Sequence, residues 1–154
     1  MDSRKFSYGA TSALVTGMAL VSGLDAANGR RLTIITGLLI FAIADNLSDS
    51  LSIHVYQESE RLNERAAFRA TLANFATRFA LSLSFVLIVV LVPVPFLVIV
   101  AIIWGSGVLC MMTAVLARQR GVSVASEVAK HLALAAVVIA GSKGIGAWLV
   151  RIVG

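Results

Sequence analysis

Several residue types are scarce in this chain of 154 residues, and each scarcity excludes a class of protein. Cys110 is the single cysteine, which excludes an intramolecular disulfide framework and a zinc site made of clustered cysteines. Only 2 residues are proline and the apolar runs are long, so the composition is not that of a disordered protein. Charged residues make up 14% of the chain, whereas about 25% is usual for a soluble domain. The composition therefore excludes an ordinary soluble domain.

Hydrophobic residues take the place of the missing charges. They form 58% of the chain and give it a mean hydropathy of +0.91, more apolar surface than one small core can bury. A helix needs about 20 largely apolar residues to cross a bilayer. Five segments meet this need: residues 7–24, 32–55, 72–92, 96–117 and 129–150. We therefore predict an all-α integral membrane protein with five transmembrane helices, folded as a single membrane domain over residues 1–154.

Lysine and arginine are distributed unequally between the two sides of this predicted arrangement. One side holds Arg4, Lys5, Arg61, Arg65, Arg69, Arg118, Arg120 and Lys130. The other side holds Arg30, Arg31 and Arg151. Because cytoplasmic loops are enriched in basic residues, the N-terminus is predicted to be cytoplasmic and the C-terminus non-cytoplasmic. The net charge of +5 has the same origin, and because no basic patch contains interleaved aromatic residues, nucleic acid is not an expected partner.

Motifs of common enzyme classes do not occur in the sequence. It contains no Gly-x-Ser-x-Gly, no His-Glu-x-x-His and no phosphate-binding P-loop. We therefore expect no enzymatic activity, no catalytic residues and no bound cofactor.

The second predicted span contains an unusual group of polar residues. At about 100° per residue, Asp45, Ser48, Asp49 and Ser52 project from one stripe of a helix, and Asn46 widens it. An ionised carboxylate at membrane depth is costly, so the two aspartates need a compensating partner. Carboxylate, hydroxyl and amide oxygens suit divalent ions such as Mn²⁺ or Fe²⁺. One interpretation is therefore a metal site on a conduction path.

The other interpretation is structural ion pairing inside the membrane. Arg78 and Lys143 are basic residues within predicted spans and could neutralise the aspartates. Arg78 enters the membrane from the same side as Asp45 and lies at nearly the same depth, at 1.5 Å of helix per residue. Lys143 lies further toward the outer face. Arg78–Asp45 is therefore the expected pair, and its guanidinium would repel a divalent cation.

Small residues recur at a spacing of four in two of the predicted helices. Such stripes allow two helices to approach closely, either within the chain or between two copies of it. The stripes are Gly9, Ala13 and Gly17 in the first helix, and Ala136, Ala140 and Gly144 in the fifth.

Three segments resemble the vacuolar iron transporter family of membrane proteins. The run 8–16 is similar to the signature of the family's first helix, and the run 44–48 looks like part of its second-helix motif. The run 92–96 resembles the proline-containing turn before its fourth helix. The resemblance covers essentially the whole chain, with five spans in the same order and orientation.

The resemblance implies a homodimer in the lipid bilayer that exports Fe²⁺ or Mn²⁺ from the cytosol in exchange for protons. It implies the cell membrane in a prokaryote or a vacuolar-type organelle membrane in a eukaryote. The chain departs from the family at its metal-handling positions: an aspartate of the first helix corresponds to Ser12, a methionine of the second helix to Asp49, and a glutamate to Ile53. The family's cytosolic metal-binding domain shrinks here to residues 57–70.

The function predicted from the sequence is transport of a divalent transition metal ion, and the resemblance implies protons as the coupling ion. Asp45 and Asp49 would carry the cation or proton, Asn46, Ser48 and Ser52 would be neutral oxygen ligands, and Ser12 would face them from the first helix. The alternative is a membrane protein that is silent in transport or carries another solute. In that case the carboxylates are held by Arg78 and Lys143.

Overall fold

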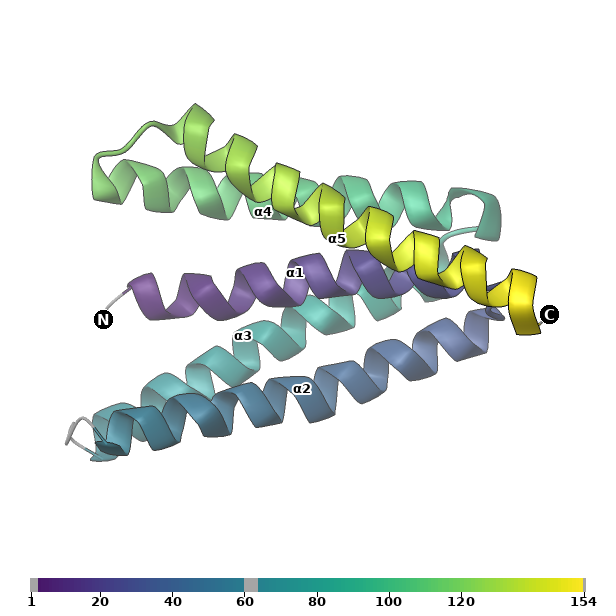
Figure 1. Ribbon diagram of the computed structural model, residues 1–154. Coiled ribbons are helices and arrows are strands. Elements are labelled where there is room, and N and C mark those ends of the chain that lie inside the picture. The colour runs from purple at the N-terminus through teal and green to yellow at the C-terminus, as the bar shows by residue number, and fades with distance from the viewer. Residues whose placement is uncertain (1–2, 60–63, 154) are drawn as a thin grey trace.

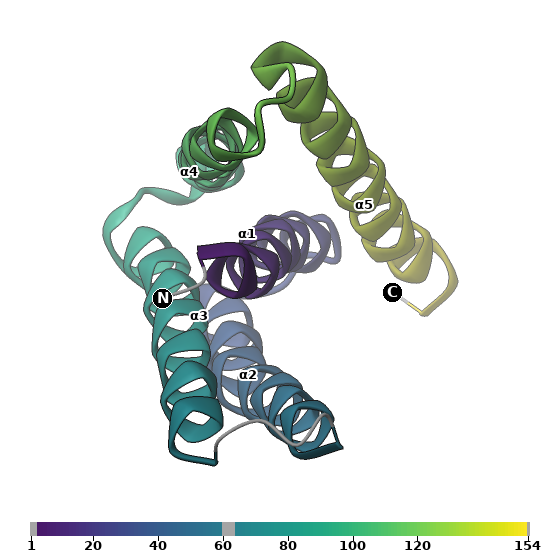
Figure 2. The same cartoon turned by 90° about the vertical axis from the view of Figure 1, so that its left-hand side faces the viewer.

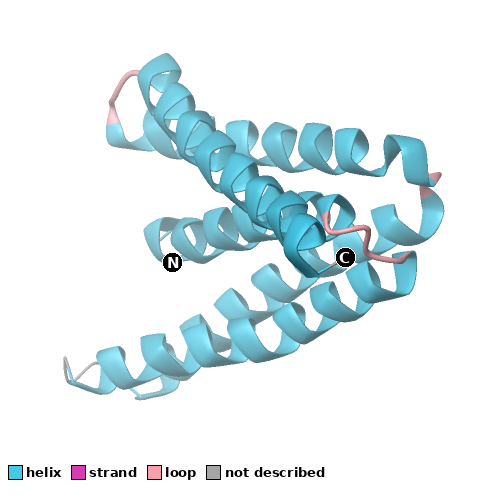
Figure 3. Ribbon diagram, turned by 45° about the vertical axis from the view of Figure 1, so that its right-hand side comes forward, coloured by secondary structure: helices cyan, strands magenta, loops and turns pink. Residues whose placement is uncertain are grey.

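The computed structural model describes residues 3–59 and 64–153, and these residues form helices joined by short connections (Figures 1 and 3). The long helices are α1 (Ser3–Ala26), α2 (Arg31–Ser59), α3 (Glu64–Leu91), α4 (Leu97–Arg120) and α5 (Val124–Val153). A 3-10 turn, η1 (Val94–Phe96), precedes α4. No strand occurs within the described ranges, so the prediction of an all-α fold is confirmed there.

Four helical segments are long and apolar enough to cross a membrane, which marks the chain as an integral membrane protein. These segments are Arg31–Tyr56, Phe68–Leu91, Val94–Arg120 and Val124–Val153. Over its described residues α1 does not reach the same apolar composition, because glycine, alanine, serine and threonine occupy much of it. A fifth crossing by α1, and the side of the membrane on which each terminus lies, stay predictions.

α1 occupies the centre of the bundle. Viewed along the helices, it lies between the α2–α3 pair and the α4–α5 pair, and it packs against all four (Figure 2). Its small residues make these contacts possible: a Cβ atom at Gly17 would lie 2.5 Å from Cδ2 of Phe85 on α3. At the other end of α1, Gly146 of α5 packs directly on the backbone of Gly23. The stripe of Gly9, Ala13 and Gly17 therefore packs α1 within the chain.

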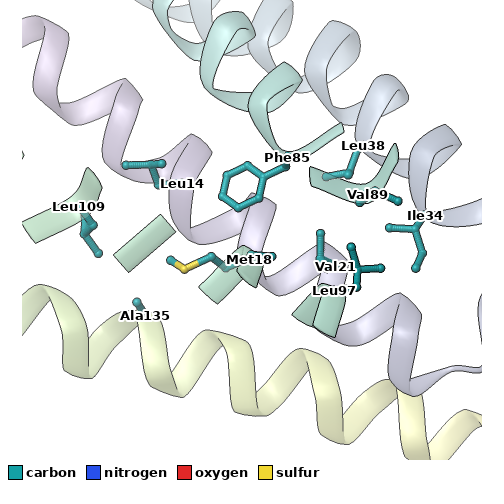
Figure 4. Close-up of a cluster of buried hydrophobic side chains, with 11 residues drawn as sticks. Leu14, Met18, Val21, Ile34, Leu38, Phe85, Val89, Leu97, Leu109 and Ala135 are labelled. Carbon is teal, nitrogen blue, oxygen red and sulfur yellow. The ribbon is translucent and has the colours of Figure 1, made fainter. Parts of the chain in front are cut away.

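The apolar core extends from the interface of α1, α2 and α3 along α4 to Ala135 on α5 (Figure 4). Most of its members come from the first third of α2, the last third of α3 and the middle of α1, toward the end of the bundle where α2 begins. These members are Leu14, Met18, Val21, Ile34, Leu38, Phe85, Val89 and Leu97, each at most 1% exposed. The cluster closes this end of the α1–α2–α3 interface with apolar side chains.

Arg31 ties the start of α2 to the end of α3. Its guanidinium donates to the carbonyl oxygens of Val90 (2.9 Å) and Val92 (2.8 Å). The last carbonyls of a helix have no partner within the helix and carry partial negative charge, so an arginine is well suited to this place. The contact fixes the antiparallel pairing of α2 and α3, on which the site described next depends.

Candidate functional site

Arg78 is the centre of a buried polar cluster between α1, α2 and α3. It lies on α3 within the membrane-spanning segment Phe68–Leu91, and only 2% of it is exposed. A guanidinium stays charged in proteins and carries five N–H groups, so at this depth it must be matched by acceptors. The acceptors come from two other helices.

Two aspartates of α2 accept from Arg78. Its Nη2 lies 2.7 Å from Oδ2 of Asp45, and its Nη1 lies 3.1 Å from Oδ2 of Asp49. Residues four apart in a helix share one face, so both carboxylates reach the same guanidinium from successive turns. The ion pair of Arg78 with Asp45, expected from their similar depth, is present, and Asp49 joins it.

Asn46 and Gly9 complete the set of acceptors. Nε of Arg78 donates to Oδ1 of Asn46 at 2.9 Å, and Nη1 donates to the carbonyl oxygen of Gly9 on α1 at 3.1 Å. Asn46 is fully buried and is itself oriented by two bonds from its Nδ2, to the carbonyl of Ala42 (2.8 Å) and to Oγ of Ser82 (3.3 Å). Its amide oxygen is therefore committed to Arg78.

Asn74 extends the cluster by one turn of α3, on the side of Arg78 nearer the α2–α3 loop. Its Nδ2 lies 3.5 Å from Oδ2 of Asp49, a long hydrogen bond. Its Oδ1 is buried and has no hydrogen-bond partner, and it points at the Cα of Gly9, where a Cβ atom would overlap it. Glycine at position 9 thus permits both the Asn74 placement and the bond from Arg78 to the α1 backbone.

Among the side chains that the structure describes, the charges of this cluster do not balance. One guanidinium faces two carboxylates, and the side chains of Asp45 and Asp49 are 50% and 33% exposed. With both carboxylates ionised the cluster has one negative charge in excess, and each aspartate has a second oxygen outside the ion pair. The arrangement can therefore accept one additional positive charge beside Arg78.

The remaining predicted site residues do not join this cluster. Ser48, Ser52 and Ser12 are exposed, and the Ser52 hydroxyl donates to the Ser48 carbonyl of its own helix at 3.0 Å. Within the described residues, no hydrogen bond joins Ser12 to the aspartates, and the residue of α1 that packs on Asn74 and Arg78 is Gly9. The structure thus assembles Asp45, Asp49 and Asn46 of the predicted set and leaves the three serines outside.

Lys143 does not neutralise the aspartates, which corrects one of the alternatives drawn from the sequence. It lies on an exposed side of α5, and the ion pairs found among the described residues do not include it. The reason is the packing of α5, which contacts α1 and α4, whereas the aspartates lie at the junction of α2 and α3.

In the structure, predicted metal ligands contact a basic side chain. Within residues 3–59 and 64–153, no group of three or more histidine, cysteine, aspartate or glutamate side chains could hold a metal ion. The oxygens that the sequence suggested as ligands, those of Asp45, Asp49 and Asn46, face a guanidinium instead.

Three groups of the cluster were not identified from the sequence: Asn74, Ser82 and the Gly9 carbonyl. The two side chains were detectable in principle, since residues 74, 78 and 82 place asparagine, arginine and serine on one face of an apolar helix. Every residue has a backbone carbonyl, so the sequence could not single out that of Gly9.

Comparison with known proteins identifies no relative, because no family model, no curated protein and no solved structure matches this chain.

Proposed function

We propose that this chain is a membrane transport protein for a cation, in which Asp45 and Asp49 carry the cargo and Arg78 is their internal counter-charge. The observation that carries the proposal is the unequal charge of the cluster among the described side chains, two partly exposed carboxylates against one buried guanidinium. Ionisable groups in membrane helices are costly, and they commonly mark the pathways of ions and protons. A cluster built only to hold helices together would gain from balanced charge and complete burial.

The charge of the cluster also bears on the cargo. While Arg78 stays in place, a proton or a monovalent cation brings the cluster to neutrality. A divalent ion would leave an excess positive charge close to the guanidinium. Transport of Fe²⁺ or Mn²⁺, implied by the resemblance to the vacuolar iron transporter family, therefore requires Arg78 to release at least one carboxylate during the cycle. If the cargo is divalent, the guanidinium and the metal ion compete for the same carboxylate oxygens.

Flux into proteoliposomes tests the proposal. The purified full chain is reconstituted, and proton entry is followed with a trapped pH dye and Mn²⁺ or Fe²⁺ entry with trapped calcein. We expect the native chain to support flux of at least one of these ions, and Asp45→Asn and Asp49→Asn to remove most of it. Asp25→Asn is the matched control, because this aspartate lies near the C-terminal end of α1, outside the cluster.

Two outcomes would contradict the proposal. One is native flux no greater than that of protein-free liposomes for protons, Mn²⁺ and Fe²⁺ alike. The other is flux that survives both aspartate substitutions. Absent flux would favour the alternative, a transport-silent protein with its carboxylates held by Arg78, whereas surviving flux would mean that the cargo does not use these two aspartates. The hydrogen bonds of Arg78 support this alternative, because its Nε, Nη1 and Nη2 all have acceptors.

A second copy of the chain is the proposed partner, in keeping with the family resemblance. The small residues of α1 are used within the chain, so they are unsuited to holding a dimer together. The stripe of Ala136, Ala140 and Gly144 on α5 is exposed, and a Cβ atom added at Gly144 would meet no other atom within 4 Å. We therefore place the dimer contact on this face of α5.

A further inference from the structure

Buried polar atoms without partners gather on one side of Arg78. Within the described residues, the hydroxyls of Ser50 and Thr71 and the Oδ1 of Asn74 are buried and have no hydrogen-bond partner. Ser50 is 3% exposed and Asn74 is 4% exposed. The one comparable hydroxyl outside the α2–α3 pair is that of Ser22 on α1.

The pairing of α2 and α3 places these three residues along one seam. The helices run antiparallel, with Asn46 on Ser82, Asp45 on Arg78 and Asp49 on Asn74. Continuing this register toward the α2–α3 loop brings Ser50, one turn beyond Asn46, next to the turn of α3 that carries Asn74. Thr71 follows one turn further on, toward the end of the bundle where α2 ends and α3 begins. We call Ser50, Thr71 and Asn74 the polar seam.

The opposite direction along the same pair of helices has a different character. Beyond Asn46 and Ser82, the interface is formed by Leu38, Ile34, Phe85 and Val89, all at most 1% exposed (Figure 4). Arg78 therefore stands at a boundary, with a polar seam on its loop side and a closed apolar core on its other side.

Each buried polar group without a hydrogen-bond partner lowers the stability of the folded protein, unless a bound molecule supplies that partner. Leaving a buried donor or acceptor unpaired costs about 1–3 kcal/mol, and native structures contain few such groups. Three along one seam, next to a cluster with an excess negative charge, indicate a ligand that hydrogen-bonds to hydroxyl and amide groups. Water has this chemistry, and buried waters typically bridge such groups. In a membrane-spanning pair of helices, unsatisfied groups are tolerated where they line a water-filled space.

We propose that the polar seam is a hydrated access path, which leads water and small cations from the α2–α3 loop end of the bundle to Asp49. The apolar core closes the path beyond Arg78, so the cluster is open toward one side of the membrane only. The inference that cargo uses this path rests on the proposed transport function. Hydration of the seam does not rest on it.

Silver-ion accessibility of introduced cysteines tests the path. Ser50→Cys and Thr71→Cys are made in a Cys110→Ala chain, and Val89→Cys and Leu38→Cys are the controls from the closed core. The full chain in membrane vesicles is exposed to Ag⁺ in chloride-free buffer. Thiols that remain unblocked are then labelled with a fluorescent maleimide after unfolding in detergent. Ag⁺ is a small cation and reacts with thiolate, the form that water access favours.

We expect Ag⁺ to block the two seam cysteines at least about tenfold faster than the two core cysteines, because thiolate reactivity follows exposure to water. Equal rates at all four positions, or protection of both seam cysteines, would overturn the proposal. Serine and cysteine are close in size, so Ser50→Cys is expected to fold, and Thr71→Cys, which is half-buried, supports the same test if it does not. Accessible seam cysteines in a chain without flux would remove the transport function and leave the hydrated seam. Flux in a chain whose seam cysteines are protected would overturn the hydrated seam and leave the transport function.

Discussion

The guanidinium of Arg78 on α3 donates to the carbonyl oxygen of Gly9 on α1 at 3.1 Å, so the ion cluster is tied to the backbone of the central helix. The contact depends on glycine. A Cβ atom at position 9 would overlap Oδ1 of Asn74 and would lie 3.0 Å from Cδ of Arg78. The position of α1 along α3 and the arrangement of the charges are therefore coupled at this one residue.

Gly9→Ala is expected to destabilise the protein, since the added methyl group must displace Asn74. Overpacking of this kind typically costs about 1–3 kcal/mol. The measurement is thermal unfolding in detergent. Gly107→Ala and Gly141→Ala are matched controls on exposed helix positions, where a Cβ atom meets nothing within 4 Å. There the same change is expected to be neutral or stabilising by up to about 1 kcal/mol. Equal effects at all three glycines would contradict the role given to Gly9.

Arg78→Gln is expected to destabilise the protein far more than Asp45→Asn. Removing the guanidinium leaves two carboxylates facing each other, whereas removing Asp45 still leaves Arg78 paired with Asp49. Arg78→Gln breaks a buried ion pair, which typically costs about 3–5 kcal/mol of folding stability. Asp45 is half-exposed, so Asp45→Asn is expected to cost less, about 1 kcal/mol. Unfolding of the single and double variants measures this. Asp45→Asn should recover part of the loss caused by Arg78→Gln, and purely additive effects would count against the shared cluster.

Mn²⁺ is expected to leave the melting temperature of the native chain unchanged and to raise that of Arg78→Gln. In the variant, two carboxylates with no counter-charge remain on one face of α2, which suits an oxygen-liganded cation. A ligand at about 100 times its Kd stabilises the folded state by about 2.7 kcal/mol. Adding Asp49→Asn to Arg78→Gln should abolish the shift. A rise in the native chain that Asp45→Asn removes would instead mean that the metal binds with Arg78 in place.

Gly144→Leu is expected to weaken a dimer held by α5, because a large side chain prevents the close approach that small residues permit. Cross-linking in native membranes measures the dimer. Gly141→Leu is the matched control, since it adds the same volume at another exposed glycine of the same helix but off the stripe. Detection of the native chain as a monomer alone would rule out the dimer altogether.

A reporter fused after Gly154 tests the predicted orientation. The excess of lysine and arginine on the other side of the membrane predicts a non-cytoplasmic signal. If a second reporter places the N-terminus in the cytoplasm, a cytoplasmic signal after Gly154 would mean that the chain crosses the membrane an even number of times, and α1, the least apolar helix, would be the one that does not span.

Local features of the sequence are enough to predict the helices, the membrane environment and one ion pair. Helix formation and hydropathy are local properties, so five apolar runs located α1 to α5, although α3 begins at Glu64, well before the predicted start at residue 72, because its first turns are polar. Depth along a helix is also a local property, because each residue adds about 1.5 Å. For this reason the pairing of Arg78 with Asp45 could be anticipated from residue numbers.

Which faces of the helices meet depends on the packing of the whole chain. In a soluble protein the apolar face of a helix reveals the interior, but a membrane helix is apolar all round, because lipid and core resemble each other. Nothing local could therefore show that Ser12 and Lys143 are exposed, or that Asn46 and Asn74 face Arg78. The same packing turned the predicted metal ligands into partners of a guanidinium, because α3 lies against the acidic face of α2 and brings Arg78 to it.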